Sequence, residues 1–186
     1  MESYLAYATL VTGVFYVILA SRNNIWCWLF GIISSALQIY INLDKHLYQD
    51  AILQTYYIGV GFYGWWVWGQ KFGPEQELPI VSWSLPQNLK VIALGCVLFP
   101  IFGYLFSLIG NSLSYIDAAV TVFSFIATWM TTKKILQNWL YWIVIDLVAG
   151  IMYVIKDVNA LTILYLIFVP LAIYGYLEWQ KKLKAA

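Results

Sequence analysis

Seven long apolar runs, separated by short polar breaks, constrain this chain more than any other feature of its sequence. Each run has about 17–20 residues, the length of an α-helix that crosses the hydrocarbon core of a bilayer. The runs cover residues 3–20, 25–43, 49–68, 91–109, 116–131, 138–155 and 160–178. Strict alternation of apolar and polar residues is absent, which disfavours a transmembrane strand barrel. We therefore predict an all-α integral membrane protein with seven transmembrane helices.

The composition agrees with a membrane location. Of the 186 residues, 62% are hydrophobic and 10% are charged, whereas a soluble domain is roughly 45–50% apolar and 25% charged. A soluble fold of this size could not bury so much apolar surface, so we expect the lipid bilayer as its environment. The net charge of +1 gives no indication of a nucleic-acid partner. The first run lacks a preceding basic segment, which favours a retained helix over a signal peptide.

Lysine and arginine residues are distributed unevenly between the polar breaks. Eight follow the first, third, fifth and seventh runs, and two follow the second and sixth. The larger set is Arg22, Lys71, Lys90, Lys133, Lys134, Lys181, Lys182 and Lys184, and the smaller set is Lys45 and Lys156. Because basic residues concentrate on the cytoplasmic side, we predict a cytoplasmic C-terminus and an N-terminus outside.

The two ends of the chain resemble each other at an offset of 111 residues. Tyr63-Gly64-Trp65-Trp66-Val67-Trp68 ends the third run, and Tyr174-Gly175-Tyr176-Leu177-Glu178-Trp179 ends the seventh. The same offset, without gaps, aligns Trp28 with Trp139 and Arg22 with Lys133. The alternative explanation is chance similarity between apolar segments.

This offset predicts a parallel internal repeat of three helices, one linking helix and three helices. Residues 1–68 would form the first three-helix repeat, 69–111 a cytoplasmic loop with the fourth helix, and 112–186 the second repeat with the cytoplasmic C-terminus. A single linking span lets the second repeat enter the membrane in the orientation of the first. Repeats related by an axis along the membrane normal are a known transporter plan, used also by the SWEET sugar carriers.

Polar and aromatic side chains recur on one face of four predicted helices. These sets are Ser35, Gln38 and Asn42; Gln54, Tyr57 and Gly61; Asp117, Thr121, Ser124 and Thr128; and Trp139, Trp142, Asp146 and Tyr153. Polar groups are costly in lipid, so we expect these faces to surround an internal cavity. The candidate substrate-binding residues are Asp146, Trp142, Trp139, Asn138, Gln54, Tyr57, Ser35, Gln38, Asp117 and Thr121.

Asp146 is the most informative of these candidates, because an unpaired carboxylate in mid-membrane costs at least about 2.5 kcal/mol. It could contact a cationic or amino-bearing ligand or carry a proton, or it could be a protonated packing group. Trp139 and Trp142 lie near it in sequence, and their ring faces suit a flat, positively charged ring. Asp117, near the start of its helix, has an alternative role as an N-terminal cap.

Five other tryptophans lie near the ends of predicted helices or in the long break. They are Trp65, Trp66, Trp68, Trp83 and Trp179. Tryptophan is enriched where a membrane meets water, so we predict that these five form an interfacial belt.

Several other functional classes lack their sequence signals. His46 is the sole histidine and no HExxH occurs, so we expect no metal site and no cofactor. Neither GxxxxGK[ST] nor GxSxG is present, which leaves no support for an ATPase or a serine hydrolase. A membrane enzyme would need a nucleophile and base, and no such pair is visible. Bulky inward aromatics disfavour an open channel, so we predict a carrier that is not an enzyme.

Several motifs support a family resemblance. Asn138-Trp139-Leu140-Tyr141-Trp142, followed by Asp146, is similar to the NWxxW signature of the Pnu family of bacterial vitamin transporters. Further similarities are Trp28-Leu29-Phe30-Gly31-Ile32, Leu47-Tyr48 with Gln54, Tyr63 to Trp68, Ile116-Asp117 and Thr131-Thr132-Lys133-Lys134. The resemblance covers about residues 24–68 and 115–179.

The resemblance implies a three-one-three fold in the bacterial inner membrane, often as a homotrimer. It implies facilitated diffusion of a small, unphosphorylated vitamin, which a cytoplasmic kinase then traps. The nicotinamide riboside branch tends to have Asn where this chain has Asp146. A carboxylate can pair with the aminopyrimidine or thiazolium of thiamine, or with the pyridinium of nicotinamide riboside. We favour thiamine as the cationic substrate on this one residue, with nicotinamide riboside as the alternative.

Overall fold

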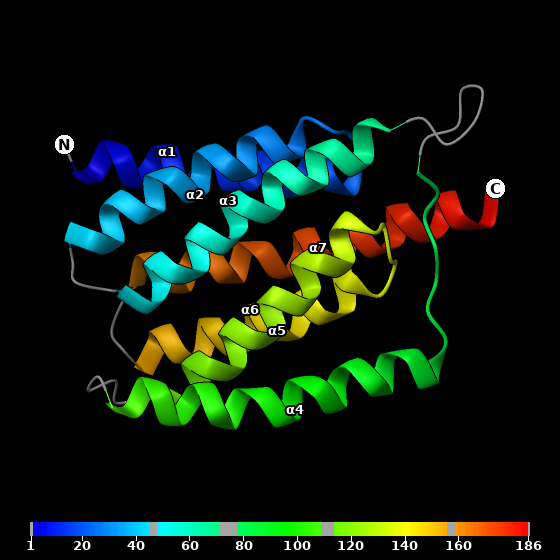
Figure 1. Cartoon of the computed structure of the whole chain (residues 1–186). Helices are drawn as coiled ribbons and strands as arrows, with labels where there is room; N and C mark the ends of the chain where they lie inside the picture. The colour runs from blue at the N-terminus through cyan, green and yellow to red at the C-terminus, as the bar shows by residue number, and fades with distance from the viewer. Residues whose placement is uncertain (1, 45–47, 71–77, 109–113, 156–158, 186) are drawn as a thin grey trace.

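The computed structural model describes residues 2–44, 48–70, 78–108, 114–155 and 159–185 (Figure 1). Seven helices and no named strand lie within these ranges. They are α1 (Glu2–Ser21), α2 (Cys27–Asp44), α3 (Tyr48–Gly69), α4 (Leu85–Leu108), α5 (Ser114–Thr132), α6 (Asn138–Ile155) and α7 (Asn159–Ala185). Each overlaps one predicted span, which confirms the all-α prediction.

Four helices within the described ranges are long and apolar enough to cross a membrane. They are α2, α4, α6 and most of α7, and α1 contributes a shorter apolar stretch, Tyr7–Ser21. Helix α5 falls outside this set because serine and threonine interrupt its apolar sequence. Several of those polar side chains, such as Ser124 and Thr128, are buried inside the bundle, where they avoid contact with lipid.

The helices form a bundle in which α1–α3 and α5–α7 are two groups (Figure 1). Within the groups, α1 packs on α2 and α2 on α3, as α5 packs on α6 and α6 on α7. The groups meet through α1 with α7 and α3 with α5. If α1, α2 and α3 are exchanged with α5, α6 and α7 in that order, the same pairs of helices are in contact. Helix α4 packs chiefly on α5, at the side of the bundle.

The α1–α2 turn, the end of α3, the α5–α6 turn and the C-terminus lie at one end of the bundle, called here the C-terminal end (Figure 1). Seven described basic residues lie in or beside these segments or at the start of α4. They are Arg22, Lys90, Lys133, Lys134, Lys181, Lys182 and Lys184. Lys45, His46, Lys71 and Lys156 lie outside the described residues. Membrane orientation therefore stays a prediction from the sequence.

The α1–α2 and α5–α6 turns have the same backbone design. Asn23 and Lys134, 111 positions apart, each adopt a left-handed conformation, with φ of 63° and 51°. In each turn the left-handed residue donates its N–H to the carbonyl three residues back, and the next residue donates to the carbonyl five residues back. These two bonds satisfy helix-end carbonyls, as in a Schellman motif. Asn tolerates this conformation better than Lys does.

Four tryptophans, Trp28, Trp68, Trp139 and Trp179, form a buried cluster near the C-terminal end, called here the tryptophan core. The rings of Trp28 and Trp68 meet edge to face at 5.3 Å, and those of Trp139 and Trp179 at 5.4 Å. The indole N–H of Trp68 donates to the Thr132 carbonyl at 3.1 Å. These packed rings connect the two helix groups.

Trp179 makes the reciprocal contact, donating its indole N–H to the Ala20 carbonyl at 3.0 Å. Each helix group therefore anchors a tryptophan on the turn of the other. The predicted interfacial belt is wrong for these two residues, because Trp68 is 5% exposed and Trp179 is 0% exposed. Trp66 faces outward with 61% of its surface exposed, and its place in an interfacial belt stays a prediction.

Two glycines allow this close packing. A Cβ at Gly64 would overlap the ring of Trp28, and one at Gly175 would lie 2.6 Å from the ring of Trp139. Both positions follow the 111-residue offset. The glycines are therefore required by helix contact rather than by backbone conformation.

A short extended segment, residues 78–84, crosses the C-terminal end after α3. Val81 pairs with Ile135 in an isolated parallel bridge. The Trp83 N–H donates to Gln137 Oε1 at 2.8 Å, and Gln137 Nε2 donates to Ser82 Oγ at 2.7 Å. Leu78 and Ile80 pack against the tryptophan core, so this segment covers that end of the bundle.

Candidate substrate-binding site

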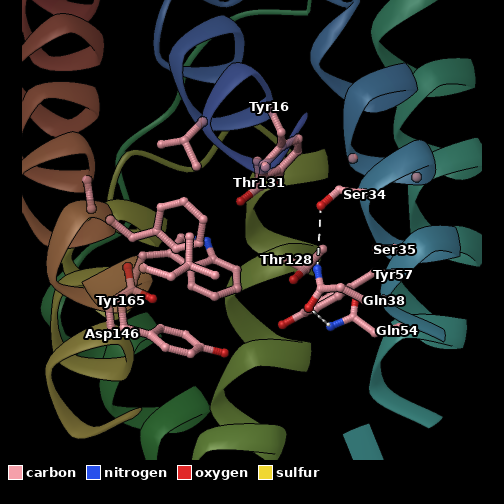
Figure 2. Close-up of a pocket in the computed structure, with 18 of the residues that line it drawn as sticks. Tyr16, Ser34, Ser35, Gln38, Gln54, Tyr57, Thr128, Thr131, Asp146 and Tyr165 are labelled. Atoms are coloured by element: carbon pink, nitrogen blue, oxygen red, sulfur yellow. Dashed lines mark hydrogen bonds between the residues drawn. The ribbon is translucent and has the colours of Figure 1, made fainter. Parts of the chain in front are cut away.

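A cavity of about 140 Å³ lies between the two helix groups (Figure 2). Its described lining comes from six helices, three in each group, and none of it from α4. The lining residues are Thr9, Gly13, Tyr16, Val17, Trp28, Gly31, Ser34, Ser35, Gln38, Gln54, Tyr57, Gly61, Thr128, Thr131, Asn138, Trp139, Trp142, Asp146, Leu164, Tyr165, Phe168 and Ala172. Helix packing thus produces the internal space with polar and aromatic lining residues that the sequence predicts.

One side of the cavity, formed by α2 and α3, carries amides and hydroxyls (Figure 2). Gln54 Nε2 donates to Gln38 Oε1 at 3.1 Å, and Gln38 Nε2 donates to Ser34 Oγ at 3.4 Å. Ser34 Oγ in turn donates to the Thr9 carbonyl at 3.2 Å. This chain of three hydrogen bonds orders the polar side of the cavity.

The opposite side combines aromatic rings with one carboxylate. Trp139, Trp142 and Asp146 come from α6, and Tyr165 and Phe168 from α7. The side chain of Asp146 is 3% exposed. Within the described part of the chain, no ion pair joins Asp146 to a basic side chain. A buried carboxylate beside aromatic faces is suited to a cationic ligand.

Four buried polar atoms of lining residues have no hydrogen-bond partner within the described protein. They are the indole Nε1 atoms of Trp28 and Trp139, together with Thr9 Oγ1 and Gln54 Oε1. A buried polar group left without a partner costs about 1–3 kcal/mol. Such groups are rare in folded proteins, and these four belong to residues that line one cavity.

Eight of the ten residues predicted from sequence line this cavity. They are Asp146, Trp142, Trp139, Asn138, Gln54, Tyr57, Ser35 and Gln38. Asn138 uses its amide within the protein, since Nδ2 donates to the Ile135 carbonyl at 2.6 Å and Oδ1 accepts from Thr131 Oγ1 at 3.1 Å. Its side chain therefore holds the start of α6 in place.

Asp117 and Thr121 are not among the lining residues, in contrast to the prediction. They share a helix face with Thr128, which does line the cavity. The spacing of residues identifies the face of a helix but not the depth at which a cavity meets it. Asp117 and Thr121 lie two to three turns nearer the start of α5 than Thr128 does. The prediction therefore chose the helix face that lines the cavity, but at a different depth along the helix.

Sequence reasoning missed the contributions of α1 and α7. Tyr16 on α1 and Tyr165 and Phe168 on α7 resemble ordinary apolar or interfacial aromatics, so nothing in their own helices marks them. The internal offset could have found two of them, because Tyr165 and Phe168 lie 111 positions after Gln54 and Tyr57.

Seven such pairs, each 111 positions apart, line the cavity from both helix groups. They are Val17 and Thr128, Trp28 and Trp139, Gly31 and Trp142, Ser35 and Asp146, Gln54 and Tyr165, Tyr57 and Phe168, and Gly61 and Ala172. Only the tryptophan pair is identical. The cavity thus has matching positions on its two sides and different chemistry at most of them.

A family model described as "Nicotinamide mononucleotide transporter" matches residues 3–181. The chain belongs to this family. It is 25% identical to the nicotinamide riboside transporter PnuC of Escherichia coli strain K12, over 91% of this chain and 82% of the relative. It is 24% identical to the protein of the same name from Neisseria mucosa, over 98% and 74%.

A solved structure has the same fold. The crystal structure of the vitamin B3 transporter PnuC superposes with a TM-score of 0.84, at 24% identity, over 99% of this chain and 83% of that one. The family confirms the predicted Pnu resemblance and identifies a membrane transporter rather than an enzyme.

The expected preference for thiamine is not supported, because these relatives are named for nicotinamide riboside. That preference rested on Asp146 alone. A carboxylate attracts a pyridinium as readily as a thiazolium, so its charge could not discriminate between the two vitamins.

Proposed function

We propose that this chain carries nicotinamide riboside across the bacterial inner membrane by facilitated diffusion. The observation that carries the proposal is the division of the cavity into a carboxylate with aromatic rings on one side and amides with hydroxyls on the other. Nicotinamide riboside has a matching division, with a flat cationic ring at one end and a sugar at the other. The names of the relatives support the same substrate.

The lining favours the riboside over its phosphorylated form. Among the described lining residues there is no lysine or arginine, and Asp146 is the acidic one. A buried phosphate needs basic or multiple N–H partners, and a neighbouring carboxylate repels it. The mononucleotide in the family description is therefore not the substrate that we propose for this chain.

We propose the following roles for the lining residues. Asp146 and the rings of Trp139 and Trp142 hold the cationic ring, and Ser35, Gln38, Gln54 and Tyr57 hold the polar remainder. Asp146 acts as a ligand contact and not as a proton carrier, so transport follows the substrate gradient. A cytoplasmic kinase would trap the vitamin by phosphorylating it, because the product no longer fits the cavity.

We also propose the three-one-three parallel repeat, with residues 1–68 and 112–186 as repeats and 69–111 as the linking segment. The exchangeable helix contacts, the two left-handed turns and the reciprocal tryptophans support it. The N-terminus would lie outside and the C-terminus in the cytoplasm, as the basic residues favour. A homotrimer is the assembly that the family resemblance implies, and light scattering of the purified protein would measure it.

Uptake into proteoliposomes that contain the purified protein and no kinase tests this function. Labelled nicotinamide riboside should enter saturably and equilibrate with the outside concentration. Unlabelled riboside should compete, whereas nicotinamide mononucleotide and thiamine should compete at least tenfold less well. An uncoupler should leave the rate unchanged. Uptake that does not saturate would indicate a channel, and uptake that collapses with the uncoupler would indicate proton coupling; each contradicts the proposal.

A further inference from the structure

Resting on the proposed function, we propose that Gln54 selects the substrate by accepting a hydrogen bond from a sugar hydroxyl. Gln38 and Ser34 act as positioning residues that fix the orientation of the Gln54 amide. The three side chains and the Thr9 carbonyl form a chain of hydrogen bonds whose direction is set at one end.

The Thr9 carbonyl sets the direction, because a backbone carbonyl can only accept. Ser34 Oγ donates its single proton to this carbonyl, and its oxygen then accepts from Gln38 Nε2. With its nitrogen turned to Ser34, Gln38 presents Oε1 to Gln54, which donates from Nε2. While Ser34 donates to Thr9, each amide has one orientation that satisfies its neighbour.

The consequence appears at the far end of this chain. Gln54 is 7% exposed, and its Oε1 is buried without a partner in the described protein. Rotating the amide by half a turn would place two acceptors against each other at Gln38. Gln54 lines the cavity and its buried Oε1 is the unfilled acceptor there, so a ligand that supplies an N–H or O–H at this position would complete it.

The opposite side of the cavity identifies which end of the substrate reaches Gln54. Figure 2 shows Asp146 and Tyr165 on one side and Gln38 and Gln54 on the other. A cationic ring held beside Asp146 leaves the sugar facing α2 and α3. Ribose hydroxyls are hydrogen-bond donors, whereas a deoxy or alkylated position is not. Gln54 thus distinguishes a hydroxyl-bearing cation from one that lacks that hydroxyl.

Binding of deoxy analogues to the unmodified protein and to Gln54 variants tests this contact. Tryptophan fluorescence of the purified protein would measure the Kd of nicotinamide riboside and of its 2′-deoxy, 3′-deoxy and 5′-deoxy forms. In the unmodified protein, one deoxy form should bind about tenfold more weakly than the riboside. Gln54→Met should weaken riboside binding by about the same factor and should abolish the difference between the riboside and that deoxy form.

Variants of Gln38 test the positioning role. Gln38→Met removes the acceptor that orients Gln54, so it should reduce discrimination at the same hydroxyl. Gln38→Glu keeps an acceptor facing Gln54 Nε2 and should retain the discrimination. Asp146→Asn should weaken all four ligands by the same factor, because it touches the ring and not the sugar. Gln180→Met, on α7 outside the cavity lining, should change none of the four affinities.

The outcomes separate this inference from the proposed function. If the riboside binds and Gln54→Met leaves every deoxy penalty unchanged, the Gln54 contact is wrong and the proposed function stands. If the unmodified protein does not bind the riboside, the proposed function fails and this inference fails with it. If Gln54→Met does not fold, Gln54→Asn, shorter by one methylene, should abolish the same difference.

Discussion

The tryptophan core and the substrate cavity use the 111-residue offset in opposite ways. In the core, the paired positions are identical, with Trp28 matching Trp139 and Trp68 matching Trp179. In the cavity, Ser35 faces the space from one helix group and Asp146 from the other. Trp28 and Trp139 belong to both regions, and at the other six paired positions of the cavity the two residues differ. The core therefore has the same residue type at its paired positions, and the cavity does not at most of its own.

The largest expected effect tests the symmetry of the core. Gly64→Val and Gly175→Val should each destabilise the protein by about 1–3 kcal/mol, because the new side chain overlaps a tryptophan ring. The two losses should be similar. Thermal unfolding of the purified variants measures them.

Gly59→Val is the control for these variants, because a Cβ at Gly59 has no described neighbour within 4 Å. It should lower the unfolding temperature much less than either core variant. A large loss for one core glycine and none for the other would show that the two halves of the core do not carry equal weight.

The second prediction concerns the asymmetric pair in the cavity. Asp146→Asn should weaken binding of nicotinamide riboside by about thirtyfold, because a charge-assisted contact is worth about 1.5–3 kcal/mol. Ser35→Ala, 111 positions earlier, should cost less than threefold. Calorimetric titration of both variants tests the difference, and equal losses would contradict the assignment of the cationic ring to α6.

The third prediction concerns the other unequal pair, Gly31 and Trp142. Trp142→Leu should weaken riboside binding by about tenfold, because a desolvated cation over an indole face is worth up to about 2 kcal/mol. Trp142→Phe keeps an aromatic face and should recover part of the loss. A Leu variant that binds as well as the unmodified protein would remove Trp142 from the site.

The smallest expected effect concerns the reciprocal anchors. Trp68→Phe and Trp179→Phe each remove one indole N–H and the hydrogen bond that it donates to a carbonyl of the other helix group, at about 1 kcal/mol. Riboside affinity should stay within threefold, because neither residue lines the cavity. Chemical unfolding in detergent would measure the losses, and clearly unequal values would show that the anchors are not equivalent.

Much of the fold could be predicted because its cause is local. Runs of apolar residues predict the helices, and the three- and four-residue spacing of Gln38, Gln54 and Asp146 with their neighbours predicts the inward faces. The depth of the cavity could not be predicted, as Thr121 illustrates, because depth depends on how neighbouring helices stack.

The tryptophans illustrate a second limit. Trp66 and Trp68 both lie at the end of α3, and the sequence gives each the properties of an interfacial residue. Trp66 is 61% exposed, whereas Trp68 is buried against the second helix group. The rotation of α3 decides between these outcomes, together with the close contact of Gly64 on α3 with the ring of Trp28. Both follow from tertiary packing.

The reciprocal anchors also join parts of the molecule that are far apart in the chain. The Ala20 carbonyl, at the end of the first helix, receives its indole partner from Trp179, 159 residues later. The backbone N–H of Asn23 already donates to this carbonyl, so the turn is closed from within its own helix group and Trp179 adds a second, distant donor. Loop-closure entropy makes such a distant contact slow to form. A chain that lacked Trp179 would keep the backbone bonds of its α1–α2 turn and would lose the bond that joins this turn to α7.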